Sequence, residues 1–291
     1  MTSPPSHNND NDGLAEGRPL NSSADQARNP NPDSNPTPPN AALGMPTFRQ
    51  ECVDFWRFVR HPSPSPRLSG RAVGTGWEAD WRCGTPVKRL LQWALLLWVL
   101  NLFVLGPVAV SVAGLSGSEH RLDMHNIPWL TGLLWAPLVE EMAFRYGLRR
   151  PIQALWFTPL AFVPVLVGPQ GWTAGLVMLM LLVAWWGVRH APVTVGGAWR
   201  GFFHSRFGWI FHLSALGFAA MHLNNFKLGD IAFWLVPALV LPQYATGLVL
   251  GWLRVRRGIG ASVCLHAMFN GGPLLLVWLV MTFAPESVQL P

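Results

Sequence analysis

The stretch LLQWALLLWVLNLFVLGPVAVSVAGLSGS, residues 90–118, contains 29 consecutive residues without a charged side chain. About 20 such residues are enough to cross a hydrocarbon core of roughly 30 Å, because an α-helix rises about 1.5 Å per residue. Of the 291 residues in the chain, 50% are hydrophobic and only 12% are charged. A soluble domain usually carries about 25% charged residues. We therefore expect a chain whose solvent is partly lipid.

Five further stretches have little or no charge: 127–139, 151–188, 207–226, 231–253 and 258–285. The one that begins at Pro151 is too long for a single helix and contains GPQGW near its middle. Pro-Gln-Gly is a turn signal, so we expect two helices that meet around Gln170. The chain is therefore predicted to be an all-α, polytopic transmembrane helical bundle of about seven spans.

Lysine and arginine are divided unevenly between the connections. One set of connections carries Arg149, Arg150, Arg189, Arg200, Arg206, Arg254, Arg256 and Arg257, and Lys88 and Arg89 precede the first span. The opposite set carries only Arg121 and Lys227. The positive-inside rule then predicts a cytoplasmic N-terminus, and we expect a multi-pass protein of a bacterial plasma (inner) membrane. The net charge is +6, but the basic residues lie at span ends and form no separate patch. We therefore expect no nucleic-acid partner.

The N-terminal part differs in composition from the rest of the chain. Residues 1–46 hold nine prolines and eight asparagines and almost no aromatic residues, which predicts a disordered tail. In residues 47–60, TFRQECVDFWRFVR, apolar residues recur at helical spacing with arginines between them. This predicts an amphipathic helix on the membrane surface, followed by a linker that ends at residue 85.

Charged residues inside spans are informative, because each costs about 2.5–3.5 kcal/mol at mid-bilayer on insertion scales. APLVEEMAFRYGLRR, residues 136–150, holds such a group. Glu140 and Glu141 are about 100° apart on a helix, so we do not expect them to reach the same target. Arg145 follows Glu141 at i,i+4, so this pair is predicted to neutralise itself and leave Glu140 facing the bundle interior. The alternative is a helix end whose charges reach water.

Two other segments place polar groups on apolar helices. In SALGFAAMHLNNF, residues 214–226, Phe218 and His222 share one face, although a lone histidine there is more often a core residue. In GASVCLHAMFNGG, residues 260–272, His266 and Asn270 point to one side. These two can be interhelical hydrogen-bonding groups, oxyanion stabilisers or part of a metal shell.

The chain contains three motifs on separate predicted spans, in the order EExxxR, FxxxH and HxxxN. In this it resembles the CPBP (ABI, CAAX-type) family of intramembrane proteases. That family includes the endopeptidases that trim prenylated CAAX proteins. The resemblance covers about residues 130–275 and implies a transmembrane protease domain over 86–291. The chain departs from the family in two ways. The usual FRG is Phe144-Arg145-Tyr146-Gly147, and about two spans of extra sequence lie within 157–206.

The resemblance implies hydrolysis of peptide bonds. Glu140 is then the general base, His222 helps to hold and polarise the water, and His266 and Asn270 stabilise the oxyanion. Structural support is expected from Glu141, Arg145 and Phe218. The expected partners are the lipid bilayer and a membrane-bound or lipidated peptide substrate.

A zinc version is a second reading of the same residues. Glu140, His222 and His266 can form a Glu-plus-two-His set with water as the fourth ligand. No HExxH motif is present. A zinc-bound Glu140 would not remain a free base, so we favour a mechanism without a cofactor.

The competing class is a non-enzymatic transporter or an assembly or immunity protein that uses these polar residues as packing contacts. Gly247 and Gly251 form a GxxxG motif, which allows close helix approach and fits either class. A transporter usually shows internal repeats, and neither the EExxxR nor the HxxxN segment recurs in the chain.

Overall fold

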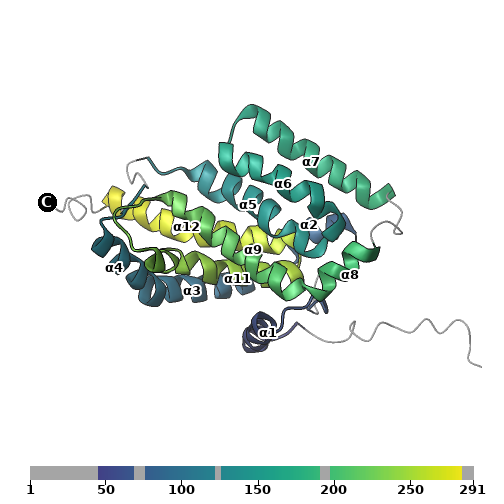
Figure 1. Ribbon diagram of the computed structural model, residues 1–291. Coiled ribbons are helices and arrows are strands. Elements are labelled where there is room, and N and C mark those ends of the chain that lie inside the picture. The colour runs from purple at the N-terminus through teal and green to yellow at the C-terminus, as the bar shows by residue number, and fades with distance from the viewer. Residues whose placement is uncertain (1–44, 69–75, 122–125, 191–196, 284–291) are drawn as a thin grey trace, which may run out of the picture. The chain divides into compact units, whose positions relative to one another are not determined.

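The computed structural model describes residues 45–68, 76–121, 126–190 and 197–283. Nearly all of the predicted disordered tail, and part of the predicted linker, lie outside the described residues. The described chain is all-α apart from one short pair of strands, in agreement with the expected fold class (Figure 1).

The longer elements are the α-helices α1 (Phe48–Arg60), α2 (Trp77–Trp81), α3 (Val87–Leu100), α4 (Gly106–Ser116), α5 (Ala136–Phe144), α6 (Pro151–Val167), α7 (Gly171–His190), α8 (Gly197–Ser205), α9 (Phe207–Met221), α10 (Val236–Leu239), α11 (Leu241–Arg256) and α12 (Ile259–Phe283). Tighter or wider turns are η1 (Asn101–Leu105), η2 (Thr131–Trp135), η3 (Tyr146–Arg149), η4 (His222–Asn225) and η5 (Phe233–Leu235). Strands β1 (Glu119–His120) and β2 (Phe226–Lys227) pair antiparallel, with Glu119 opposite Lys227.

Two wide π-helical turns, η1 and η2, each end two residues before a proline. Pro107 and Pro137 have no backbone N–H, and their rings clash with the carbonyl one turn earlier in a regular helix. An extra residue in the preceding turn relieves this clash, which explains why η1 joins α3 and α4 into one continuous helix, Val87–Ser116.

Fewer helices meet a length criterion for membrane spans than the seven we expected. Among the described residues three are long and apolar enough: Val87–Ser116, Gly171–Val188 and Ile259–Phe283. A fourth is counted if Phe233–Leu239 and Leu241–Arg256, bent by 53°, form one span. The helices α5, α6 and α9 have 9, 17 and 15 residues. A π-helical turn precedes α5, Gly168 at positive φ ends α6, and a 3-10 turn follows α9.

The predicted break near Gln170 is confirmed. Helix α6 ends at Val167 and α7 begins at Gly171, with Gly168 between them at φ +85°. The hydroxyl of Thr173 accepts a hydrogen bond from the backbone N–H of Gln170, which caps the start of α7. Helix α6 packs against both α5 and α7.

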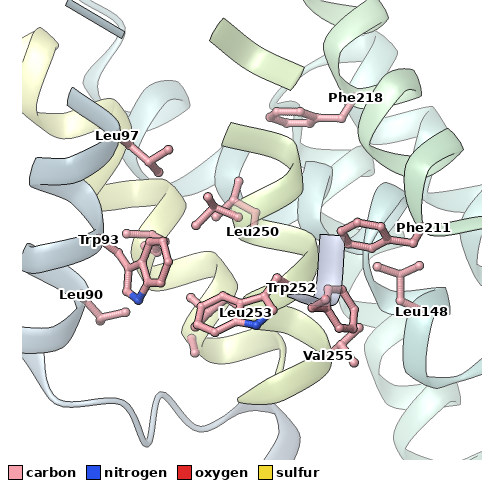
Figure 2. Close-up of a cluster of buried hydrophobic side chains, with 14 of the residues drawn as sticks. Leu90, Trp93, Leu97, Leu148, Phe211, Phe218, Leu250, Trp252, Leu253 and Val255 are labelled. Carbon is pink, nitrogen blue, oxygen red and sulfur yellow. The ribbon is translucent and has the colours of Figure 1, made fainter. Parts of the chain in front are cut away.

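Helix α11 lies at the centre of the largest hydrophobic cluster. Side chains of α3, including Trp93, and of α9, including Phe211, meet those of α11 from two sides (Figure 2). A Cβ atom at Gly251 would lie 2.8 Å from the Phe211 ring, and one at Gly247 would lie 3.3 Å from a backbone oxygen of α9. The GxxxG motif therefore allows α9 and α11 to approach closely, as its spacing indicated.

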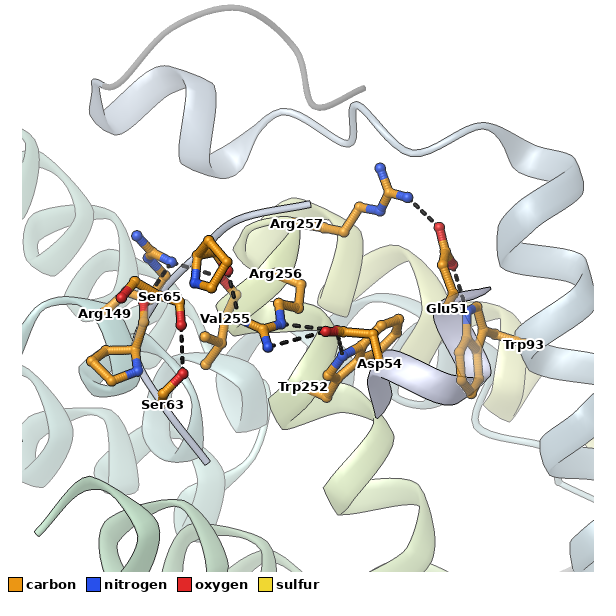
Figure 3. A network of polar contacts seen from close by, with 12 residues as sticks. Glu51, Asp54, Ser63, Ser65, Trp93, Arg149, Trp252, Val255, Arg256 and Arg257 are labelled. Atoms are coloured by element: carbon orange, nitrogen blue, oxygen red, sulfur yellow. Dashed lines mark hydrogen bonds and ion pairs between the residues drawn. The ribbon is translucent and has the colours of Figure 1, made fainter. Parts of the chain in front are cut away.

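Helix α1 is fixed to the bundle by its acidic residues as well as by its apolar stripe. Glu51 is fully buried, forms an ion pair with Arg257 and accepts a hydrogen bond from Trp93 at 3.0 Å (Figure 3). Asp54 accepts two hydrogen bonds from Arg256, at 2.9 and 3.2 Å. The apolar stripe that predicted a surface helix, including Phe48, Cys52, Phe55 and Val59, packs against the protein core.

Candidate active site

Side chains from three distant segments line one cavity of about 590 Å³. Glu140 reaches it from α5, His222 from the end of α9, and His266 and Asn270 from α12. Helix α5 contacts both α9 and α12 (Figure 1). The four residues predicted to act together therefore lie around one space.

Glu140 is the carboxylate that faces this cavity. Its Oε2 atom lies 3.7 Å from Nε2 of His266, and its side chain is 18% exposed. Among the described residues this buried oxygen has no hydrogen-bond partner. Its lone pairs are therefore free to accept a proton from a molecule in the cavity.

Glu141 forms the predicted ion pair with Arg145, at 3.1 Å, and both side chains are fully buried. One expectation about Glu141 was wrong, because it reaches the same target as Glu140. Nδ1 of His266 lies 3.0 Å from Oε1 of Glu141, while Nε2 faces Glu140. Two carboxylates about 100° apart on α5 meet the opposite nitrogens of one imidazole ring, which lies between them.

The protonation of His266 follows from these contacts. An ionised carboxylate only accepts hydrogen bonds, so Nδ1 of His266 carries a proton and donates it to Glu141. The cluster then has two carboxylates and a single guanidinium, that of Arg145. Nε2 of His266 faces Glu140, and both residues line the cavity.

The ring of Phe218 holds this cluster in place. The Arg145 guanidinium lies 3.8 Å from the ring centroid, a cation–π distance. The imidazole of His222 lies 4.6 Å from the same centroid and that of His266 lies 5.6 Å from it. Phe218 therefore contacts Arg145 and both histidines, which gives a physical reason for the phenylalanine in FxxxH.

His222 presents one defined nitrogen to the cavity. Its Nδ1 atom lies 2.8 Å from the carbonyl oxygen of Phe218, and a carbonyl only accepts, so Nδ1 is the protonated nitrogen of the neutral ring. The lone pair of the neutral imidazole is then on Nε2. His222 follows the last residue of α9 and starts the turn η4, so its side chain is held at a helix end.

Asn270 is anchored on the other side of the cavity. Its Nδ2 amide donates a hydrogen bond to the backbone oxygen of Gly132, at 3.0 Å. A primary amide has two N–H groups, so one remains for a ligand. Gly132 lies in the wide turn η2, whose geometry is set by Pro137 two residues after its end.

A family model described as type II CAAX prenyl endopeptidase Rce1-like matches residues 125–272, half of the chain. The chain belongs to this family. The matched region agrees with residues 130–275, where the sequence motifs showed the resemblance. Comparison with curated proteins and with solved structures gives no match. Membership of this family implies a CAAX-type endopeptidase of the membrane.

The two departures of this CAAX-type endopeptidase from the usual pattern meet in the structure. Tyr146, in the altered FRG segment, stacks on Phe157 of α6 with ring centroids 4.0 Å apart. Its hydroxyl lies 2.5 Å from Oε1 of Gln153, and Nε2 of Gln153 donates a hydrogen bond to the backbone oxygen of Ala184 in α7, at 2.9 Å. The inserted region therefore packs onto the end of α5 through the tyrosine.

The zinc reading needs three ligands at one point. Within the described ranges, no group of three His, Cys, Asp or Glu side chains is arranged to hold a metal ion. Both nitrogens of His266 also face carboxylates. We therefore derive no step of the reaction through a metal.

The sequence did not single out Ser262 or Gly132. Ser262 is fully buried and its hydroxyl contacts Glu141. It precedes His266 by one helical turn, so the spacing SxxxH was the available signal. The contact of Gly132 runs through its backbone oxygen, which no side-chain pattern reveals.

Proposed function

We propose that this endopeptidase hydrolyses peptide bonds of membrane-bound or lipidated peptides in the cavity lined by Glu140, His222, His266 and Asn270. The observation that supports this most strongly is made at Glu140, which lines the cavity. Its Oε2 atom is buried and has no hydrogen-bond partner among the described residues. Buried carboxylates usually have partners, so an unpartnered one in a cavity marks a functional group.

In the proposed reaction, Glu140 takes a proton from a water held between its carboxylate and Nε2 of His222. The hydroxide attacks the carbonyl carbon of the peptide bond. We take His266 to be protonated on both nitrogens at this stage, so that its Nε2–H and the second amide N–H of Asn270 donate hydrogen bonds to the oxyanion. Glu140 then delivers its proton to the leaving amine. The Glu141–Arg145 pair keeps His266 oriented and adds no further net charge.

The substrate follows from the family and from the surroundings of the site. Members are named for prenylated CAAX substrates, which are held at the membrane by their lipid. Apolar side chains such as Trp135, Phe269 and Leu274 line the same cavity as the polar groups. Such a lining favours a peptide that carries an apolar group next to its scissile bond.

We further propose the membrane arrangement: seven spans, a cytoplasmic N-terminus and a bacterial plasma membrane, with residues 47–85 at the interface and 86–291 as the protease domain. The shorter helices support this by their outer faces. Leu155 and Leu166 on α6 are 59% and 68% exposed, and Trp209 and Leu213 on α9 are 69% and 58% exposed. Large apolar side chains in such numbers are suited to contact with lipid.

The test of the activity uses purified protein in lipid nanodiscs and a fluorogenic peptide that contains S-farnesylcysteine, two aliphatic residues and a free C-terminus. We expect the wild type to release the C-terminal fragment and Glu140→Gln to cleave the peptide about 10³-fold more slowly. For Asn270→Ala we expect a loss of about 10²-fold, in kcat more than in KM. His222→Ala and His266→Ala complete the set.

Metal analysis of the same samples separates the two mechanisms. Activity that survives exhaustive chelation, with no stoichiometric zinc in the protein, supports the proposed metal-free reaction. Loss of activity on chelation and its return with zinc would contradict that part. A Glu140→Gln variant that cleaves at the wild-type rate would contradict the proposed function itself.

A further inference from the structure

Ser262 lies on α12 one helical turn before His266 and is fully buried. Its hydroxyl contacts Oε2 of Glu141 and lies 3.0 Å from the backbone oxygen of Leu250 on α11. Both atoms are acceptors, and a hydroxyl has one proton to donate. Hydrogen bonds to ionised carboxylates are about twice as strong as neutral ones, so the hydroxyl of Ser262 donates its hydrogen bond to Glu141.

The two oxygens of Glu141 have different partners. Arg145 and His266 both approach Oε1, at 3.1 and 3.0 Å, and Ser262 contacts Oε2. The last torsion of a glutamate side chain is broad, so contacts at one oxygen alone leave the carboxylate plane poorly defined. The hydroxyl of Ser262 at the second oxygen fixes this plane.

The orientation of the carboxylate sets that of the imidazole. Nδ1–H of His266 points at Oε1 of Glu141, and the opposite nitrogen then points at Glu140, 3.7 Å away. A carboxylate that binds Nδ1–H holds a histidine in one tautomer and one orientation in other hydrolases. Ser262 does not line the cavity, so it can influence the reaction only through these neighbours.

We propose that Ser262 is a positioning residue, which fixes Glu141 and through it aims Nε2 of His266 at the reacting atoms. The inference rests on the proposed function of the cavity. The contacts run from Ser262 to Glu141 and from Glu141 to His266, and only His266 touches the substrate.

The test compares Ser262→Ala, Ser262→Thr and a control, Ser214→Ala. Ser214 on α9 also donates a partly buried hydrogen bond to α5, but to the backbone oxygen of Phe144 and not to a carboxylate. With the farnesylated peptide, we expect Ser262→Ala to lower kcat by about 10-fold or more at unchanged KM, as for other groups that orient a functional histidine. Ser262→Thr keeps the hydroxyl and should restore most of kcat, and Ser214→Ala should retain it.

A second measurement follows the histidine without substrate. In protein labelled with ¹⁵N-histidine, the Nδ1–H proton of His266 should give a low-field, slowly exchanging signal, assigned by its loss in His266→Ala. We expect Ser262→Ala to broaden or shift this signal and Ser214→Ala to leave it unchanged. An unchanged signal in Ser262→Ala would contradict the proposal.

The kinetic outcomes separate this inference from the proposed function. If Glu140→Gln is inactive while Ser262→Ala keeps the wild-type kcat, only the role of Ser262 is overturned. The same holds if the alanine and threonine variants lose kcat equally. If Glu140→Gln is fully active, the proposed function fails first, and the NMR signal still decides whether Ser262 holds His266.

Discussion

The described part of the molecule contains two clusters of buried or partly buried charge, and they differ in how the charges are matched. In the first cluster, where α1 and the α2 region meet α11, each carboxylate has at least one guanidinium of its own. Glu51 pairs with Arg257 and Arg89, Asp54 with Arg256, and Asp80 with Arg254, Arg67 and Arg150. In the second cluster, Glu140 and Glu141 share one guanidinium, that of Arg145, and one imidazole. The same residue types thus form a matched and an unmatched set.

The difference separates a structural role from a chemical one. Each carboxylate oxygen of Glu51 and Asp54 accepts a hydrogen bond. The donors are Arg257, Arg256 and the indoles of Trp93 and Trp252 (Figure 3). Breaking such a pair is costly, because it leaves a buried charge alone. In the unmatched set one oxygen of Glu140 is left for a substrate or water. A substitution of Glu140 should therefore lower the activity and change the free energy of unfolding only a little.

The largest effect is expected for Glu140→Gln. Loss of the general base should lower the cleavage rate by about 10³-fold. The free energy of unfolding should change by less than about 1 kcal/mol, because Oε2 has no hydrogen bond to lose among the described residues. The rate is measured with the farnesylated peptide and stability by denaturant titration in detergent. A variant that is inactive because it unfolds would remove the distinction between the clusters.

The mirror substitution is Glu51→Gln in the matched cluster. It removes the buried carboxylate charge that faces both Arg257 and Arg89 and should lower the free energy of unfolding by about 3 kcal/mol. The rate per folded molecule should stay at the wild-type value, since Glu51 lies outside the cavity. Both quantities are measured on the same preparation, with Glu140→Gln beside it. A specific loss of kcat in a stable Glu51→Gln protein would argue against a purely structural role.

A smaller effect is expected for Arg256→Lys. A lysine keeps the charge but cannot make both hydrogen bonds that Arg256 donates to Asp54. Because the Asp54 side chain is 29% exposed, solvent screens the pair, and we expect a loss of about 1 kcal/mol in the free energy of unfolding. Arg206→Lys, at an exposed arginine, serves as the control and should have no effect.

The smallest effect concerns Cys83, in the loop before α3. A hydrogen bond from the Cys264 thiol lowers the pKa of Cys83 from its ordinary value of 9.0 to about 7. The thiolate is the reactive form, so alkylation of Cys83 by iodoacetamide should rise through about pH 7 and level off above it. In Cys264→Ala the rise should move to higher pH. Mass spectrometry of the alkylated peptide gives the profile, and identical profiles would show that this loop does not rest on α12.

Local spacing made part of this structure predictable. The ion pair of Glu141 with Arg145, the break near Gln170 and the close approach at Gly247 and Gly251 each depend on one helix or one turn. Three motifs were enough to predict the family, because each motif alone is weak but their order along the chain is typical of the family.

What the sequence did not reveal depends on contacts between helices. The angle between Glu140 and Glu141 on α5 is correct, but an imidazole from α12 lies between the two carboxylates and reaches both. The pattern of α1 indicated only an amphipathic helix and not the role of its acidic residues, whose partners Arg256 and Arg257 lie about 200 residues later. The number of spans also depends on where a 3-10 turn after α9, or the break at Gly168 after α6, ends a helix inside an apolar run.

The central claim is that a carboxylate-activated water in this cavity breaks a peptide bond. The most direct measurement is the mass of the products when wild-type protein, freed of metal, cleaves the farnesylated peptide in H₂¹⁸O. We predict one new carboxyl group with a single ¹⁸O atom, and no product from Glu140→Gln under the same conditions. An intact peptide with wild-type protein, or equal amounts of labelled product from wild type and Glu140→Gln, would contradict the account.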